Sequence, residues 1–182
     1  MSIIHCQFII YACPVGELNQ QIEDYFQKSL SLCGENKAHK YMPHCTLTGF
    51  FTDNINSIDY YLKALDKAYL AAKNNLDLSI IIKQLTFNDN WHGLELQAEG
   101  LKQLIINFAE IEKSLTRREK LRLKDWLHLS LAYSFKIEDR NKLKNLAREI
   151  INLQADVNWE LRFYQKNPDW TWKCLKQWAI NS

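Results

Sequence analysis

Two apolar segments of the chain each hold a histidine that is followed two residues later by a hydroxyl-bearing residue. One segment reads PHCTLT over residues 43–48, and the other reads LHLSL over residues 127–131. In a β-strand, residues i and i+2 point to the same face. We therefore expect His44 to lie beside Thr46, and His128 beside Ser130, with apolar side chains behind them.

This combination of groups suits the chemistry of a phosphate ester. An imidazole with a pKa near ~6.5 can act as a base or as an acid close to neutrality. Hydroxyl groups can donate hydrogen bonds to the non-bridging oxygens, where negative charge accumulates. The pattern predicts His44 and His128 as an acid–base pair and Thr46 and Ser130 as phosphate-binding groups. For either histidine alone, the alternative is a strand histidine satisfied by local hydrogen bonds.

Longer stretches around the two segments resemble a known family. The first is AHKYMPHCTL (38–47), followed by Phe50 and Phe51, and the second is LHLSLAY (127–133). The WHGL segment (91–94) and residues 157–159 fit the same pattern. The chain resembles the two-histidine (2H) phosphoesterase superfamily, and within it the phosphoesterase-like domain of T-cell ubiquitin ligand (TULA) proteins.

The resemblance implies a fold and an activity. The fold would be α+β and bilobal, with two mostly antiparallel sheets around a central groove, helices outside and halves related by a pseudo-two-fold axis. Residues 1–182 would form one domain with lobes of roughly 1–97 and 98–182. The activity would be metal-independent hydrolysis of a cyclic phosphodiester, typically a 2′,3′-cyclic phosphate, with His44 and His128 as the catalytic pair.

Two other functions stay open, a nucleotide- or phosphate-binding module without turnover and a 2′,5′ RNA ligase-like enzyme. The expected partner is a small cyclic nucleotide or an RNA 3′ end. We expect no cofactor, metal, DNA or membrane partner, and a cytoplasmic monomer. Five cysteines without a CxxC pair indicate reduced thiols, and no apolar run approaches the ~20 residues of a membrane span.

Positive charge is concentrated late in the chain. The net charge is −2 over residues 1–91 and +4 over residues 92–182, and all six arginines lie in the second part. Residues 113–124 (KSLTRREKLRLK) carry six basic residues and one acid, directly before the second histidine segment. We expect Arg122 and Lys124 to attract a phosphate-bearing substrate. The alternative is a solvated helix end.

Several aromatic residues near the histidines could stack on a substrate ring, namely Phe50, Trp91, Trp126 and Tyr133. Core packing is the alternative for each of them. Plain strand alternation places Tyr133 on the face opposite His128. It also places Trp170, Trp172 and Trp178 together on one face of the last strand, as core or as a hydrophobic lid.

The periodicity of the apolar residues predicts the elements that position these groups. The apolar spacing predicts four helices. Three cover residues 16–33, 100–115 and 143–151, and the other begins at a cap at Asp53 or Asn54 and runs to about residue 69. Strands are expected over 2–12, 44–51, 76–87, 91–97, 127–135, 156–164 and 170–179. Hairpins separated by helices predict an α+β fold with a mostly antiparallel sheet.

Overall fold

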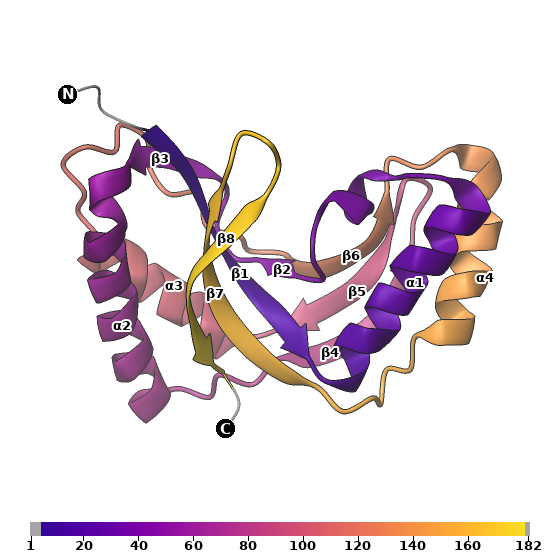
Figure 1. The fold of residues 1–182 in the computed structure, drawn as a ribbon. Coiled ribbons are helices and arrows are strands. Elements are labelled where there is room, and N and C mark those ends of the chain that lie inside the picture. Colours follow the sequence, from indigo (N-terminus) through magenta and orange to yellow (C-terminus); the bar gives the residue numbers. More distant parts are fainter. Residues whose placement is uncertain (1–4, 181–182) are drawn as a thin grey trace.

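The fold is built on one antiparallel sheet of eight strands, seen in Figure 1. The structure is a computed structural model that describes residues 5–180. The strands are β1 (His5–Val15), β2 (Cys45–Thr46), β3 (Phe51–Asn54), β4 (Ile81–Phe87), β5 (Trp91–Gln97), β6 (Leu127–Tyr133), β7 (Asn158–Lys166) and β8 (Trp172–Ala179). Their order is β4-β5-β6-β2-β1-β7-β8, and β3 also pairs with β1. The α+β class is confirmed, but the expected pair of sheets is wrong, because one continuous hydrogen-bonded ladder joins all the strands.

The sheet interleaves the two halves of the sequence. The β4–β5 hairpin, from the first half, pairs through β5 with β6 from the second half. The β7–β8 hairpin, from the second half, pairs through β7 with β1 from the first half. At the centre, β2 pairs with β6. Strands that carry the two histidine segments are therefore neighbours in the middle of the sheet.

Helices pack in two pairs at the sides of the sheet (Figure 1). The helices are α1 (Glu17–Cys33), α2 (Ile58–Asn75), α3 (Glu99–Ile111) and α4 (Arg140–Ile150), with short 3₁₀ turns at Lys37–Lys40, Ile55–Ser57 and Ile137–Asp139. Helix α1 packs on α4, and α2 packs on α3. The Asn54 side chain accepts a hydrogen bond from the amide of Asn56 and caps the turn that leads into α2. Within residues 5–180, no helix combines the length and the apolar character needed to cross a bilayer.

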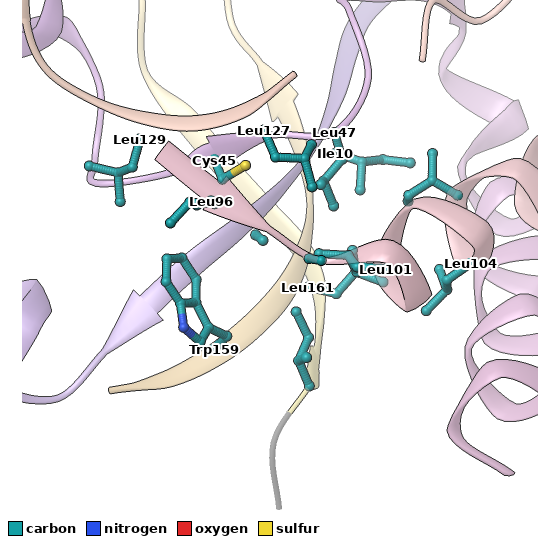
Figure 2. Packing of buried hydrophobic residues seen from close by; sticks show 14 of the residues in the cluster. Ile10, Cys45, Leu47, Leu96, Leu101, Leu104, Leu127, Leu129, Trp159 and Leu161 are labelled. Carbon is teal, nitrogen blue, oxygen red and sulfur yellow. The ribbon is translucent and has the colours of Figure 1, made fainter. Parts of the chain in front are cut away.

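Alternate strand residues bury a large core on the helix-covered side of the sheet. Figure 2 shows Cys45 and Leu47 near β2 and Leu127 and Leu129 of β6 in this core, packed with residues of β1, β5, β7 and α3. Leu129 is fully buried and Cys45 nearly so. The opposite face has only a small second cluster, to which no α-helix contributes among the described residues. We call this second face the open face.

The strand expected over 44–51 is interrupted where the chain passes β1. The Thr48 hydroxyl accepts a hydrogen bond from the Ile10 amide at 3.1 Å, and Thr48 is completely buried. The amides of Leu47 and Thr48 both donate to the Ile10 carbonyl oxygen. One residue of β1 thus faces two residues here, which divides the expected strand into β2 and β3.

Two β-bulges change which side chains reach the open face. In β6, Gly93 faces Ser130 and His92 faces Ala132, so Leu131 is the extra residue. In β8, the partners of Phe163 and Tyr164 are Lys176 and Cys174, so residue 175 is the extra one. A bulge shifts the alternation of all residues beyond it. Tyr133 and Trp172 therefore point to the open face, whereas Trp178 packs in the core.

The other boundary differences lie at the ends of elements. Residues 2–4 of the first expected strand lie outside the described part of the chain. The strand expected from residue 76 begins only at Ile81. The third helix ends at Ile111, and Leu115, expected on its buried face, is fully exposed.

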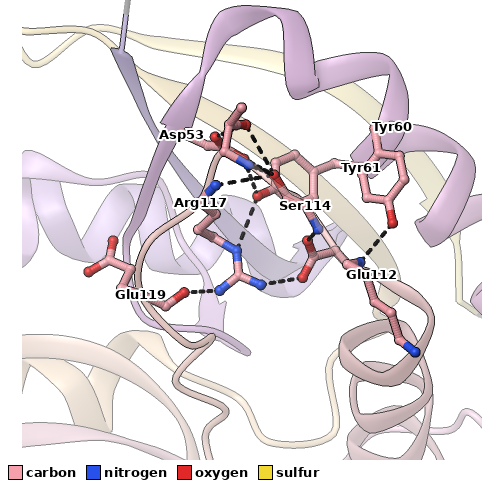
Figure 3. A network of polar contacts seen from close by, with 9 residues as sticks. Asp53, Tyr60, Tyr61, Glu112, Ser114, Arg117 and Glu119 are labelled. Atoms are coloured by element: carbon pink, nitrogen blue, oxygen red, sulfur yellow. Dashed lines mark hydrogen bonds and ion pairs between the residues drawn. The ribbon is translucent and has the colours of Figure 1, made fainter.

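A buried polar network explains why the third helix stops there (Figure 3). The completely buried Asp53 carboxylate accepts hydrogen bonds from Tyr61 at 2.6 Å, Ser114 at 2.5 Å and Thr116 at 2.6 Å. Arg117 pairs with Glu112 and donates to the Tyr61 hydroxyl. These hydrogen bonds lower the pKa of Asp53 against the opposing effect of burial. The network holds residues 112–117 against α2 and β3 instead of allowing another helical turn.

We expect Asp53→Ala to destabilise the fold by about 3 kcal/mol, because the buried Tyr61 hydroxyl and the hydroxyls of Ser114 and Thr116 would lose their acceptor. Equilibrium urea unfolding of the variant would measure this. Asp59→Ala, at an exposed position in the first turn of α2, is the matched control and should change the free energy of unfolding by less than about 0.5 kcal/mol. Similar stabilities for the two variants would show that the Asp53 network contributes little.

Candidate functional site

The four residues of the two histidine segments meet on the open face at the junction of β2 and β6. Cys45 faces Leu129 across this junction. Continuing the antiparallel register by one residue in each direction places Thr46 opposite His128 and His44 opposite Ser130. The predicted pairing of each histidine with its hydroxyl neighbour on one face is what the structure has. The two imidazoles occupy diagonal positions, for which a Cα separation of about 7–8 Å is usual.

Two rows of side chains cross the sheet at this point. One row runs Glu95, His128, Thr46, Tyr11 and Arg162, and the other runs Gly93, Ser130, His44, Cys13 and Glu160. Each row contains one imidazole and one hydroxyl, in opposite order. A tetrahedral phosphate between the rows could thus contact an imidazole and a hydroxyl on each side.

Both histidines are oriented by the backbone in the same way. His44 Nδ1 lies 2.7 Å from the carbonyl oxygen of Met42, and His128 Nδ1 lies 3.3 Å from that of Trp126. A carbonyl oxygen only accepts, so Nδ1 carries the proton in each ring. In the neutral rings this leaves the Nε2 lone pair free for a ligand.

His44 is held in a largely aromatic environment. Its ring lies 4.0 Å from the Tyr11 ring and 5.4 Å from the Tyr41 ring, measured between centroids. Burial lowers the pKa of His44 to about 4; the hydrogen bond to Met42 opposes this shift, and the positive charge of His128 adds to it. The neutral imidazole is therefore the stable form of His44 near pH 7.

His128 has a different set of neighbours. Its ring stacks on Trp126, with 3.9 Å between centroids and 26° between the planes, and meets the edge of Trp91 at 5.3 Å. Burial is also the main cause that lowers the pKa of His128, and Lys124 adds to the shift, while Glu95 opposes it. The face of Trp126 and the carboxylate of Glu95 both favour a positive charge on this ring.

Ser130 is oriented by Trp91, whose Nε1 donates a hydrogen bond to the Ser130 Oγ at 2.9 Å. The indole reaches this position across Gly93, where an added Cβ would lie 2.4 Å from the Trp91 ring. Because Ser130 Oγ already accepts from Trp91, its own proton is free to point at a ligand. Trp91 therefore lies at the site as a neighbour of Ser130 and His128.

The other aromatic candidates lie on the same face. Trp126 is half exposed and covers His128. Phe50 stacks on Trp172, with 6.0 Å between ring centroids. Tyr133 was expected on the opposite face, and the bulge at Leu131 makes that expectation wrong. Burial raises the pKa of Tyr133 to about 12, and the nearby Tyr41 contributes.

The basic segment 113–124 is divided between two roles. Leu121 and Leu123 pack against the core, and Thr48 forms a bridge with Leu123. Arg122, in between, donates to the Phe50 carbonyl oxygen at 3.3 Å. Lys124 is close enough to His128 to affect its pKa. Arg122 and Lys124 thus lie beside the site, whereas Arg117 belongs to the Asp53 network; residues 113–124 form no helix end.

The structure adds residues that the sequence did not single out. These are Tyr11 and Tyr41, which flank His44. Trp172, expected as core or as a hydrophobic lid, lies 6.0 Å from Tyr11 and 5.5 Å from Tyr41. Tyr41 directly precedes the first histidine segment, so proximity in sequence could have found it. Tyr11 lies in β1, which pairs with β2, and Trp172 lies in β8, which pairs with β7. No local sequence pattern predicts these strand pairings.

Two surface cavities lie away from the four side chains of the two histidine segments. One of about 590 Å³ is lined by residues of α1 and by Leu146 of α4, and another of about 390 Å³ is lined by Ala109, residues 117–121 and Leu123. Among residues 5–180, no three His, Cys, Asp or Glu side chains gather as metal ligands. The side chains of His44, Thr46, His128 and Ser130 are each partly buried on the open face.

Comparisons with known proteins give long relatives of moderate similarity. No family model matches the chain. It is 30% identical over 164 residues to the Homo sapiens protein named Ubiquitin-associated and SH3 domain-containing protein B, covering 88% of this chain and 25% of that protein. It is also 30% identical to the Ecdysteroid-phosphate phosphatases of Drosophila melanogaster, over 198 residues, and Bombyx mori, over 169 residues. These alignments cover 89% of this chain and 26% and 25% of the two proteins.

These relatives correct two expectations. The relatives whose names state an activity are phosphatases, and the name describes an ester of a single phosphate group. The assignment to the 2H phosphoesterase superfamily and its TULA-like domain is therefore wrong, and so is the expected hydrolysis of a cyclic phosphodiester. The chain spans about a quarter of the length of these relatives.

Acid should destabilise the fold partly through His44. Its pKa in the folded state, about 4, lies below the ~6.5 of an unfolded chain. The unfolded state therefore binds a proton more readily, and the free energy of unfolding should fall as the pH drops from about 6.5 to about 4. Urea unfolding of the wild type and of His44→Gln across this range would measure the effect.

The His44→Gln variant should show a smaller but nonzero dependence on pH. The residual dependence is expected because burial also lowers the pKa of His92 to about 4. An unchanged pH dependence in the variant would show that His44 titrates alike in the folded and unfolded states.

Proposed function

We propose that this chain hydrolyses a phosphomonoester at the His44–His128 pair. The observation that carries the proposal is the arrangement at the β2–β6 junction, where two imidazoles and two hydroxyls alternate on one face. Both Nδ1 atoms are bound to backbone carbonyls, which leaves both Nε2 atoms for a ligand. The names of the Drosophila and Bombyx relatives support a phosphate ester as the substrate class.

The neighbours of each ring assign the roles. His44, buried against Tyr11 and kept neutral, accepts a proton from the attacking water at Nε2. His128, opposite Glu95 and stacked on Trp126, is the better site for a positive charge. In the reaction it donates its Nε2 proton to the oxygen of the leaving alcohol.

The bond changes are those of an in-line displacement. A bond forms between the water oxygen and phosphorus, and the bond between phosphorus and the ester oxygen breaks, giving the alcohol and inorganic phosphate. Thr46 and Ser130 donate hydrogen bonds to the non-bridging oxygens, which carry the negative charge. The dianionic ester also raises the pKa of both imidazoles on binding, which favours the protonated form of His128.

One alternative is a module that binds a phosphate ester without turnover. The observation that favours it is the length of the relatives, because about three quarters of each lies outside the match. Binding and hydrolysis would use the same four side chains, so turnover has to be measured on this chain alone.

We expect His44→Ala and His128→Ala each to lower kcat/KM for a phosphomonoester by about 10²–10⁴-fold, through loss of proton transfer. Release of inorganic phosphate from p-nitrophenyl phosphate and from an alkyl phosphate would measure this. His5→Ala, at an exposed position of β1, is the control and should retain full activity. Phosphate binding by the wild type without any release would favour the binding module, and full activity of both site variants would exclude this site.

Trp91→Phe should lower kcat/KM about 10-fold, because the aromatic ring is kept and only the donor to Ser130 Oγ is lost. Ser130→Ala should lower it by a similar amount. The double variant tests whether the two act together. If Trp91 acts by orienting Ser130, the kcat/KM of the double variant should be no lower than that of Ser130→Ala alone. Additive losses would show that Trp91 acts independently of Ser130.

A further inference from the structure

We propose that the ester bound at the His44–His128 pair carries a planar ring, which lies against an aromatic wall beside His44. This hairpin wall consists of Tyr41, Phe50, Trp170 and Trp172. The inference rests on the proposed function, because it describes the alcohol part of the same ester. It concerns residues that come together only through the pairing of the β7–β8 hairpin with β1.

The hairpin wall is continuous with the catalytic pair. The Tyr41 ring lies 5.4 Å from His44 on one side and 5.5 Å from Trp172 on the other. Phe50 stacks on Trp172 with 27° between the planes. A ring attached to a phosphate at His44 can therefore reach the wall without crossing another part of the chain.

Trp170 is held at the edge of this wall in an unusual conformation. It lies in the turn between β7 and β8, is 50% exposed and has a φ of 65°. A bulky residue rarely adopts a positive φ, and glycine or asparagine would fit such a turn at lower cost. Hydrogen bonds between Asn167 and Thr171 close the turn. The ring lies 6.3 Å from Tyr41, so the strained turn presents an indole instead of a small residue.

Donors and cations lie beside the wall, while the one carboxylate of the turn, Asp169, accepts hydrogen bonds from Thr171. Lys166 Nζ lies 3.6 Å from the centre of the Trp170 ring, and Lys40 Nζ lies 5.7 Å from it. Neither ammonium pairs with a carboxylate within residues 5–180. The Trp172 Nε1 and the Tyr11 hydroxyl are buried and have no hydrogen-bond partner there. A ring with acceptor atoms or negative charge would match these groups.

The wall is not an ordinary core. The cluster on the open face contains only Ile9, Tyr11, Cys13 and Tyr164, with Met42, Phe50 and Trp172 packed against it. No α-helix among the described residues adds a side chain to it, in contrast to the core on the other face. Trp170 is half exposed, and Tyr41, Phe50 and Trp172 are only partly buried, so a ligand can contact the wall from the solvent side.

Two phosphomonoesters of primary alcohols test the inference, 1-naphthylmethyl phosphate and cyclohexylmethyl phosphate. Stacking on an aromatic side chain contributes to binding, so Trp170→Ala should lower kcat/KM about 10-fold for the naphthyl ester. Most of this loss should be an increase in KM. The cyclohexyl ester should change by less than about twofold, because it lacks a π-face. Leu70→Ala, a similarly exposed apolar position on α2, is the control and should change neither ester.

Binding of the two corresponding phosphonates, measured by calorimetry, separates this inference from the proposed hydrolysis. If neither ester is hydrolysed but Trp170→Ala weakens only the naphthyl phosphonate, the ring site stands and the proposed turnover fails. If both esters are hydrolysed and Trp170→Ala affects them equally or not at all, the ring site is overturned and the hydrolysis stands. Equal binding of the two phosphonates by the wild type would also overturn it.

Discussion

The pairing of β2 with β6 is the contact on which the site depends. It is short, with Cys45 facing Leu129, yet it brings together segments more than 80 residues apart in the sequence. The register is fixed by burial, because Cys45 and Leu129 have to face the core. A slip of either strand by one residue would move its apolar residues to the open face and its imidazole into the core. The same apolar residues that stabilise the sheet therefore also set the geometry of the polar ones.

Strand alternation was sufficient to predict the centre of this site. The sequence identified His44, Thr46, His128 and Ser130 as side chains of one face, and the structure places them together. Alternation predicted the wrong face of the sheet for Tyr133 and Trp172. In each strand a bulge adds one residue, and every side chain beyond the bulge then points to the other face. A bulge depends on the partner strand as much as on its own residues, so a single segment does not reveal it.

Long-range contacts account for the other differences. Leu115 continues the apolar spacing of α3, but the buried carboxylate of Asp53 binds Ser114 and Thr116 and turns the chain away. The expected pair of sheets came from the resemblance, which implied two lobes of roughly 1–97 and 98–182. A division of the sequence into halves does not specify which hairpin pairs with which half. Here each half pairs its hairpin with a strand of the other, and one sheet results.

This exchange of hairpins has a consequence for how the protein folds. β1 can pair with its long partner β7 only after about 140 further residues have been made. In the same way, β5 can pair with β6 only once β6 has been made. Contacts of such high sequence separation slow folding, because loops have to close before pairing stabilises them. During synthesis, β1 therefore stays an unpaired apolar strand on its β7 side until residues 158–166 have been made, and the hairpin wall forms only after that. The polar network around Asp53, which joins segments about 60 residues apart, can form before that point.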